Sequence, residues 1–566
     1  MKKKALPVII ILVLVLVLGG IYLIPRLLER YSYSNERADL ETYFGIRDEA
    51  DVPVILNNEI TDIHARLYEN VFYLDFSSVQ TLLNERFYHG AEDNTLLYTT
   101  PEAIITSEIG TNTATSTDGT VSEESYVIAR YEQDTLYVAL DYVKKYTDFL
   151  YEGYIAPNHL ELHVADETFP AATLKKDTKL RERGGVKSPV LEDLKRDDQV
   201  IVLEEMEIWT KVKTMNGFIG YVENKRLSAA GEHTVTIPGE APVFNYTSVF
   251  KPYKINRAWH NVAGVSGNDT LRELVEGTKG LNTVSPTWYS LSDNEGNFTS
   301  FGSSAYVNEA HALGLDVWAL INDIDHKSTI SDYQILSRAS SRANLINNLM
   351  READATGFDG INIDFEFIDE VSGESFIQFI RELSIACRAR GLVLSVDNYV
   401  PMNYNNHYHR KEQGVVCDYV IIMGYDEHGT FSTEAGSVAS IDYVTGGITR
   451  TLEEVPAEKV INAIPFYTRI WTTENGTLTS QAVGMRQAQD FVNNHGITLT
   501  WDETTCQNYG EKTEGSKFYQ VWMEDAESVS AKLSAMQHHE IAGVAAWKLG
   551  FETPDIWDTI SAYLQQ

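Results

Sequence analysis

From about residue 251 to residue 566, β-rich segments alternate with longer amphipathic segments, and this alternation limits the folds open to the chain. Segment 341–357 is typical of the helices, with Leu345, Leu349 and Ala353 on one face and Gly357 at its end. Eight strand–helix units predict an α/β fold, a (β/α)8 TIM barrel, with its working site at the carboxyl ends of the strands. The predicted strands are 255–262, 281–291, 315–323, 360–366, 392–400, 418–426, 459–468 and 541–550, and a small α+β insertion at about 471–529 separates the last two.

The segment FDGINIDFE at 358–366 carries a polar residue at every second position. Because side chains alternate across a strand, Asn362, Asp364 and Glu366 share one face, and apolar residues form the other. Taken alone, this pattern fits an edge strand with one wet face, or a strand whose polar row faces a cavity. In a barrel neither face is freely wet, so the polar row must point inward and indicates a functional site.

This strand is similar to the DxxDxDxE signature of glycoside hydrolase family 18, the chitinase and N-acetylglucosaminidase barrels. Related motifs follow in order: IIMGYDEH at 421–428, AIPFYTRIW at 463–471 and GVAAWKLG at 543–550. The first two predicted strands resemble the branch that contains spore-cortex and cell-wall glucosaminidases. The resemblance covers about residues 251–566 and implies hydrolysis of a glycan that contains N-acetylglucosamine (GlcNAc), with peptidoglycan favoured over chitin.

The resemblance also implies a role for each motif residue. Glu366 would be the general acid, with a pKa raised by burial and by Asp364. The 2-acetamido oxygen of the substrate would attack the anomeric carbon, so that configuration is retained. Asp364 would orient the amide nitrogen, and Tyr425 would hold its carbonyl. Asp359, Asn362 and Asp426 are expected to support these groups, and Trp547, Trp259, Trp288, Asn398 and Tyr467 to bind the sugar.

One residue departs from the family pattern, which usually has Asp at the position of Asn362. An Asn amide can donate a hydrogen bond to Asp364, but it cannot share a proton with it. We therefore expect a change in pH dependence more than a loss of activity. Tyr425 and Asp426 could also be structural caps, and Trp547 could be core packing.

Two classes of function remain open. The first is a retaining glycoside hydrolase, and the alternative is a non-catalytic glycan-binding or structural cell-wall protein on the same barrel. Glu366 favours the enzyme, because a binding protein has no use for an acid at that position. The motifs do not show whether the glycan is vegetative wall, spore cortex or chitin. They also do not show whether cleavage is endo or exo.

The N-terminus carries three lysines, Lys2, Lys3 and Lys4, before an uncharged stretch from Leu6 to Pro25. About 19 helical residues reach close to 30 Å, which just spans a bilayer. A cleaved signal peptide is the alternative, but its apolar run is usually shorter. The charge balance predicts a single-pass cell-membrane protein with its body extracellular. The expected segments are a cytoplasmic tail at 1–6, an anchor at 7–25 and a polar stalk at 26–50.

Two modules are expected between the stalk and the barrel. Residues 51–165 resemble the α+β module at the N-terminus of copper amine oxidases, without a recognisable copper ligand set. Residues 172–228 resemble a bacterial SH3-like barrel, either a binder of wall peptides or a spacer. Residues 229–250 are expected to form an extended linker, followed by the barrel at 251–566.

The net charge of −35 argues against nucleic acid as a partner, and also against electrostatic attachment to an anionic surface. The three cysteines show no metal-ligand spacing and form no disulfide framework. We therefore expect no metal and no cofactor. The expected partners are the glycan substrate and, through the N-terminal helix, a membrane.

Overall fold

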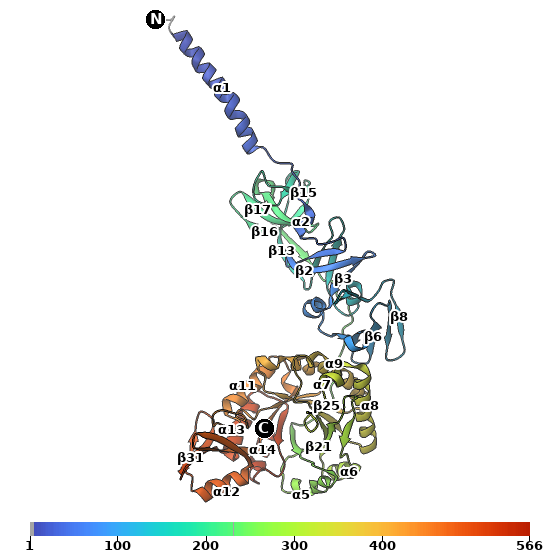
Figure 1. Cartoon of the computed structure of the whole chain (residues 1–566), viewed down its shortest axis with the longest axis vertical. Helices are drawn as coiled ribbons and strands as arrows, with labels where there is room; N and C mark the ends of the chain where they lie inside the picture. The colour runs from blue at the N-terminus through green and yellow to red at the C-terminus, as the bar shows by residue number, and fades with distance from the viewer. Residues whose placement is uncertain (1–4, 230, 566) are drawn as a thin grey trace. The chain divides into compact units, whose positions relative to one another are not determined.

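The computed structural model describes residues 5–229 and 231–565 (Figure 1). The chain divides into two compact units. The first contains the chain up to residue 87 together with residues 107–114 and 121–243, and the second contains residues 88–106, 115–120 and 244–566. Each unit is described by itself.

The second unit contains the predicted closed barrel of parallel strands, which confirms the fold class. The strand β20 (Ile255–His260) pairs in parallel with both β21 (Thr283–Leu291) and β33 (Gly543–Trp547), and so closes the sheet. The remaining strands, in spatial order from β33, are β27 (Val460–Pro465), β26 (Tyr419–Met423), β25 (Val393–Tyr399), β24 (Gly360–Asp364) and β23 (Asp316–Asn322).

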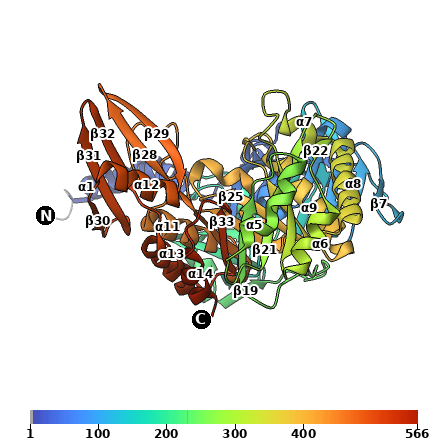
Figure 2. The same cartoon turned by 90° about the horizontal axis from the view of Figure 1, so that it is seen from below.

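Helices surround these strands (Figure 2). The helix predicted from segment 341–357 is α8 (Ala339–Thr356); Leu345, Leu349 and Ala353 are buried, and Gly357 caps its end at a φ of 80°. The residue after a helix commonly adopts this left-handed conformation, which glycine tolerates without steric cost. The other helices are α5 (Leu271–Val275), α6 (Ser304–Ala312), α7 (Asp332–Ser337), α9 (Gly373–Arg390), α10 (Arg410–Val416), α11 (Ile441–Leu452), α13 (Ala526–His538) and α14 (Ile556–Leu564).

The predicted insertion follows β27 as a separate antiparallel sheet with its own apolar core. It begins at Tyr467, earlier than the sequence pattern indicated, because β28 starts immediately after the barrel strand. Figure 2 shows its strands side by side. The insertion contains β28 (Tyr467–Glu474), β29 (Thr477–Gly484), α12 (Met485–His495), β30 (Leu499–Asp502), β31 (Gln507–Glu514) and β32 (Lys517–Trp522). Outside the insertion, the short strand β22 (Phe298–Ser300) pairs with the edge of the barrel strand β21.

Within the first unit, the predicted SH3-like region is an antiparallel sheet with a buried apolar core. The segment predicted as a polar stalk also contributes to it: α2 (Leu40–Phe44) places Phe44 in that core, 2% exposed. Part of the predicted linker forms a further edge strand. The strands are β13 (Glu167–Thr173), β14 (Thr178–Arg181), β15 (Val190–Leu194), β16 (Gln199–Glu205), β17 (Trp209–Thr214), β18 (Ile219–Glu223) and β19 (Gly231–Val235).

A second sheet of the first unit occupies the region of the predicted α+β module. Its strands are β1 (Asp51–Leu56), β2 (Glu59–Tyr68), β3 (Val71–Asp75), β9 (Ala129–Glu132), β10 (Thr135–Ala139), β11 (Leu150–Tyr154) and β12 (His159–His163), with the short helices α3 (Phe76–Ser78) and α4 (Leu140–Val143). The resemblance of this module to copper amine oxidases stays a prediction.

The division into units does not follow the predicted module boundaries, because residues 88–106 group with the barrel. Tyr88 Oη and Ser375 Oγ on α9 are 2.9 Å apart, and Gln378 Nε2 on the same helix donates to Thr99 Oγ1 at 2.9 Å. The small sheet in this region contains β4 (Phe87–Gly90), β5 (Thr95–Thr99), β6 (Ile104–Glu108), β7 (Thr113–Ser116) and β8 (Val121–Glu123).

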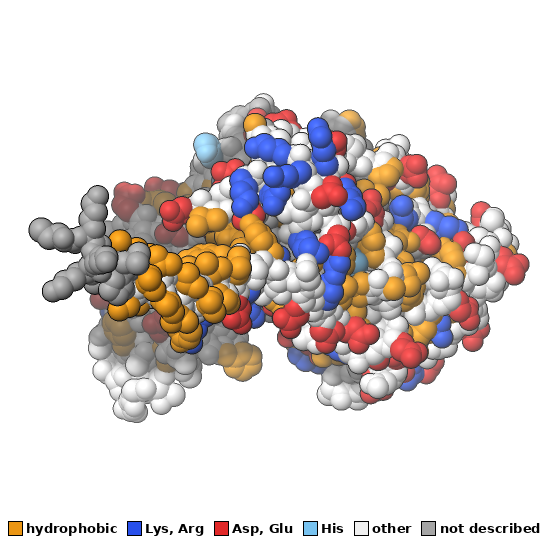
Figure 3. All heavy atoms as spheres, turned by 90° about the horizontal axis from the view of Figure 1, so that it is seen from above, with side chains coloured by type: hydrophobic (Ala, Val, Ile, Leu, Met, Phe, Trp, Pro, Cys, Tyr) orange, Lys and Arg blue, Asp and Glu red, His pale blue; other side chains and the backbone are white. Residues whose placement is uncertain are grey.

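The N-terminal helix α1 (Ala5–Tyr31) contains a segment, Ile9–Tyr31, that is long and apolar enough to cross a membrane. The large apolar side chains of the segment Ile9–Tyr31 are exposed (Figure 3). The lysines on which the predicted orientation rests, Lys2, Lys3 and Lys4, lie outside the described residues.

Candidate active site

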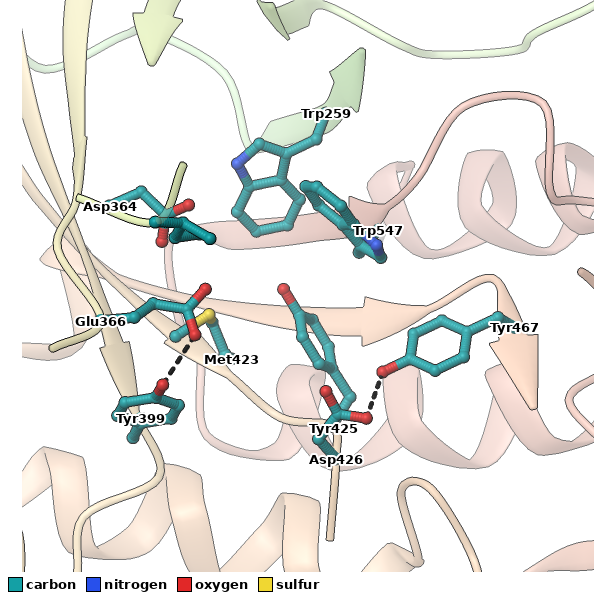
Figure 4. A pocket seen from close by; sticks show the side chains of 10 residues that line it. Trp259, Asp364, Glu366, Tyr399, Met423, Tyr425, Asp426, Tyr467 and Trp547 are labelled. Carbon is teal, nitrogen blue, oxygen red and sulfur yellow. Dashed lines mark hydrogen bonds between the residues drawn. The ribbon is translucent and has the colours of Figure 1, made fainter. Parts of the chain in front are cut away.

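A cavity of about 220 Å³ lies at the carboxyl ends of the barrel strands (Figure 4). This is the end of a TIM barrel that carries the working site. Seven of the eleven residues predicted for the site line this cavity. The lining residues are Trp259, Ile324, Asp364, Glu366, Tyr399, Met423, Tyr425, Asp426, Tyr467 and Trp547.

The two faces of β24 differ as the alternation predicts. Phe365, just after the strand, packs against Phe379 of α9, with ring centroids 6.0 Å apart. Asn362 and Asp364 point the other way, into the barrel, and are 0% and 7% exposed. The inward face of the strand therefore places the Asp364 carboxylate at the cavity.

Glu366 lies at the cavity, two residues beyond Asp364, and is half-buried. Tyr399 Oη, at the end of β25, donates to Glu366 Oε2 at 2.6 Å. Burial raises the pKa of Glu366, and the charge of Asp426 raises it further, while the Tyr399 hydrogen bond lowers it. The net direction is upward, which favours the protonated acid.

Asp364 is more deeply buried than Glu366. Burial first, and then the charges of Asp397, Glu366 and Asp323, raise its pKa well above the usual value; Arg257 opposes them. Its Oδ1 has no hydrogen-bond partner among the described residues. A buried acceptor without a partner is costly, so this oxygen is available to a donor from a ligand.

Beneath Asp364, Asn362 forms hydrogen bonds with three further interior residues. Its Oδ1 accepts from Arg257, and its Nδ2 donates to Asp397 Oδ1 at 2.9 Å and to Ser395 Oγ at 3.2 Å. The expectation that Asn362 donates to Asp364 is not what the structure shows. The amide has two donors, and Asp397 and Ser395 on the neighbouring strand take both.

The far wall of the cavity contains Tyr425, Asp426 and Tyr467. Tyr467 Oη donates to Asp426 Oδ1 at 2.6 Å, and the rings of Tyr425 and Tyr467 are 6.2 Å apart. Burial raises the pKa of Tyr425 well above its usual value, so its hydroxyl keeps its proton. Asp426 has a φ of 59°, and its side chain is half-exposed.

Two tryptophans cover the cavity from the opposite side (Figure 4). Trp547, at the end of β33, meets Trp259 of β20 edge-on, with ring centroids 5.8 Å apart. Trp259 is 1% exposed, whereas Trp547 is only partly buried. An aromatic face that remains accessible beside carboxylates is suited to stacking against a sugar ring.

Besides Asn362, three residues predicted for the site do not line the cavity. Trp288 is buried between strands and helices, where Nε1 donates to Asn268 Oδ1 at 2.7 Å. Asn398 exchanges hydrogen bonds with Gln413 on α10, because it lies on the outward face of β25. Asp359 precedes β24 and accepts from the Val317 amide at 2.8 Å, at the end of the strand remote from Glu366.

The sequence reasoning also missed polar residues of the interior, namely Arg257, Asp397 and Tyr399. Alternation along β20 puts Arg257 on the same face as Trp259, and along β25 it puts Asp397 on the same face as Tyr399. Burial raises the pKa of Asp397 to about 6, while Arg257 and Asn362 oppose that rise. The same two-residue period that located Asp364 could have located all three.

Comparisons with known families agree with this geometry. The family described as Glycosyl hydrolases family 18 matches residues 278–552, which hold Asp364, Glu366, Tyr425 and Trp547. The resemblance of the barrel to glycosyl hydrolase family 18, predicted from its motifs, is thereby confirmed. A second family, the bacterial SH3 domain, matches residues 176–228 and confirms the predicted SH3-like module.

Individual relatives of the family 18 barrel are distant. The cortical fragment-lytic enzyme of Bacillus subtilis is 28% identical over 238 residues, which are 40% of this chain and 54% of that protein. An uncharacterized glycosylase of the same organism is 23% identical over 300 residues, covering 50% of this chain and 84% of that protein. The chain spans only about half the length of the first curated relatives it matches.

Among solved structures, the spore cortex-lytic enzyme of Bacillus cereus is similar with a TM-score of 0.50. The match has 19% sequence identity and covers 59% of this chain and 77% of that one. At this identity the similarity shows the fold of the family 18 barrel alone.

Proposed function

We propose that this protein is a retaining glycoside hydrolase that cleaves glycans containing GlcNAc by substrate-assisted catalysis. One observation carries the proposal: Glu366, with a raised pKa, lies at the same cavity as Asp364, whose Oδ1 lacks a partner among the described residues. The match of the barrel to family 18 supports it, because enzymes of that family use the substrate's own amide in place of a second carboxylate.

In the proposed reaction, Glu366 gives its proton to the glycosidic oxygen while the 2-acetamido carbonyl oxygen attacks the anomeric carbon. The leaving sugar departs with that proton, and an oxazolinium ion remains. Water then attacks the same carbon, gives a proton back to Glu366, and opens the ring with net retention. Asp364 Oδ1 accepts from the amide N–H, and the Tyr425 hydroxyl holds the acetamido oxygen. Asp364 and Glu366 come from the end of β24, and Tyr425 comes from the end of β26; all three line one cavity.

Peptidoglycan is the proposed substrate, with chitin as the alternative. The bacterial SH3 domain and the relative named for lysis of cortical fragments both favour a cell-wall glycan. We also propose that α1 is an uncleaved anchor, which would hold the family 18 barrel outside a cell membrane. Its length and apolar surface support this placement.

The test is turnover of a chromogenic GlcNAc oligomer and of purified peptidoglycan by the wild type and by Glu366→Gln. Loss of a general acid should lower kcat by about 10²–10⁴-fold. Glu458→Gln, an exposed carboxylate away from the cavity, is the matched control and should leave kcat unchanged. Equal rates for Glu366→Gln and the wild type would remove the assignment. Glycan binding without turnover of any substrate would favour a non-catalytic wall-binding protein.

A further inference from the structure

Asp323 lies directly after β23, beside the proposed acid, and the sequence motifs do not include it. It is 0% exposed. Its Oδ1 accepts from the backbone N–H of Glu366 at 2.9 Å, and its Oδ2 accepts from the backbone N–H of Phe367, also at 2.9 Å. These are the amides on the two sides of the Glu366 α-carbon, so both oxygens of one buried carboxylate hold the backbone that carries the acid.

The position of Asp323 follows from where the sheet ends. The parallel pairing of β23 with β24 stops at Asn322 and Asp364. Beyond that pair, Glu366 and Phe367 have no strand partner for their N–H groups, and unpaired buried amides are costly. Past the end of β23, the Asp323 carboxylate accepts the N–H hydrogen bonds that the strand backbone would otherwise accept. Charge-assisted bonds of this kind are about twice as strong as neutral ones.

We propose that Asp323 is a positioning residue that fixes the Glu366 carboxyl for proton transfer by holding the two peptide groups that flank it. The inference rests on the proposed function of Glu366. Catalysis by a general acid requires it within hydrogen-bond reach of the leaving oxygen, and misplacement by about 1 Å can cost 10²-fold in rate. A single hydrogen bond from Tyr399 leaves the backbone of Glu366 free to shift, whereas two bonds from a buried carboxylate do not.

Several ionisable groups face Asp323. Asp332 at the start of α7 and Glu366 itself raise its pKa, and its own charge raises the pKa of Asp364 and of the Tyr408 hydroxyl. Burial is the largest cause and, with these charges, brings the pKa of Asp323 to about 7, against the two amide bonds that lower it. Protonation would convert one acceptor oxygen to a hydroxyl, so one of the two amides would lose its acceptor.

The decisive variant is Asp323→Asn, which has one acceptor oxygen and therefore resembles the protonated acid at every pH. We expect kcat on a GlcNAc oligomer to fall by about 10- to 100-fold, with KM changed less than about threefold. Removal of the negative charge should also lower the pKa of Glu366 and move the alkaline limb of the kcat profile to lower pH.

Asp332→Asn is the matched control, because it removes a neighbouring carboxylate that bonds neither amide. We expect kcat close to wild type for this variant. An equal loss of kcat in both variants would assign the effect to charge alone and overturn the positioning role. Unchanged kcat in Asp323→Asn would overturn it as well. Should that variant not fold, Asp323→Glu keeps both acceptors and displaces them by one methylene, and full activity there would count against the proposal.

A second readout separates this inference from the proposed function. The Glu366 carboxyl can be titrated by ¹³C NMR in glutamate-labelled protein, with its signal assigned by its loss in Glu366→Gln. A lower pKa in Asp323→Asn than in the wild type supports coupling between the two residues, and an identical pKa contradicts it. If the wild type cleaves no glycan, the proposed function fails, but this titration still decides whether Asp323 controls Glu366.

Discussion

In the first unit, Lys213 of β17 forms a buried ion pair with Glu161 of β12, and His163 Nε2 lies 3.1 Å from the same carboxylate oxygen. Beneath the cavity of the second unit, the buried aspartates Asp364 and Asp397 share Arg257, whose Nη1 lies 3.6 Å from Asp397 Oδ1. Both clusters are almost fully buried. In the first, each charge has a partner; in the second, negative charge is in excess.

This difference in charge balance distinguishes a buried ion pair that serves structure from a buried cluster that serves a functional site. Burial lowers the pKa of Lys213 to about 8 and the charge of Glu152 opposes that shift, while Glu161 gives the buried ammonium a direct acid partner. The barrel cluster instead keeps an Asp364 oxygen without a partner among the described residues, and neighbouring carboxylates raise its pKa. Stability alone does not favour that arrangement, whereas binding of an amide donor and proton transfer do.

The largest expected effect is on the paired cluster. Lys213→Met leaves Glu161 buried without its cation and should destabilise the first unit by about 3–5 kcal/mol. Lys213→Met combined with Glu161→Leu should recover most of that loss, because no charge remains buried there. Hydrogen exchange of the β12 and β17 amides measures the change in this unit alone. Lys195→Met, which breaks an exposed pair with Asp177, is the control and should cost less than about 1 kcal/mol.

Asp364→Asn should have the opposite effect on stability while damaging function. We expect kcat to fall by about 10²–10³-fold, because the developing charge on the substrate loses its stabilising anion. The raised pKa of Asp364 means that its ionised form costs stability above the pKa it has in the unfolded chain. The variant should therefore unfold at a higher temperature at pH 8, as calorimetry can measure. Asp354→Asn, on the surface, is the control. Loss of both activity and stability would contradict the comparison.

Asn362→Asp restores the residue usual in the family and adds negative charge to the unbalanced cluster. The new carboxylate cannot donate to Asp397, so we expect a loss of about 1–3 kcal/mol at pH 8. The loss should be smaller at pH 5, below the pKa of about 6 of Asp397, where a proton can be shared. Urea unfolding at both pH values, monitored by hydrogen exchange of the β24 amides, measures this loss of stability. An equal loss at pH 5 and pH 8 would mean that charge is not the cause.

The smallest effect is expected from Tyr399→Phe. Its hydroxyl bonds the ionised form of Glu366 and lowers the pKa of that acid. Without the hydroxyl, the pKa of Glu366 should rise, and because the acid must be protonated to act, the alkaline limb of kcat should move to higher pH. A pH–rate profile on a chromogenic substrate measures this. A shift in the opposite direction would show that Tyr399 supports the protonated form.

Local alternation predicted more of the molecule than length or composition did. The period of two along 358–366 predicted the interior face of β24, and the alternation of β-rich and helical segments predicted the barrel. What it could not give is which interior residues meet, because that depends on the stagger between strands. Asn362 therefore turned out to bond Asp397 and not Asp364. For the same reason Asn398, one residue from the inward face of β25, was assigned to the site although it bonds Gln413.

The segment predicted as a stalk shows a different limit. Its polar composition suggested solvated chain, but Phe44 is buried in the core of the SH3 domain. A helix of five residues is too short to carry a periodic signal, so only the tertiary packing reveals the partners of Phe44. The role of Asp323 is likewise not predictable from the sequence, because it depends on the two backbone amides that donate to its carboxylate.

Tyr467 forms one wall of the cavity, yet it begins β28, the first strand of the inserted sheet, and not a barrel strand. The backbone of this wall and the backbone that carries the acid thus belong to different sheets. Changes in the length of the β28–β29 hairpin can reshape the space offered to a glycan without breaking a parallel pair around the acid. Such a division lets the range of accepted glycans diversify while the reaction itself is left intact.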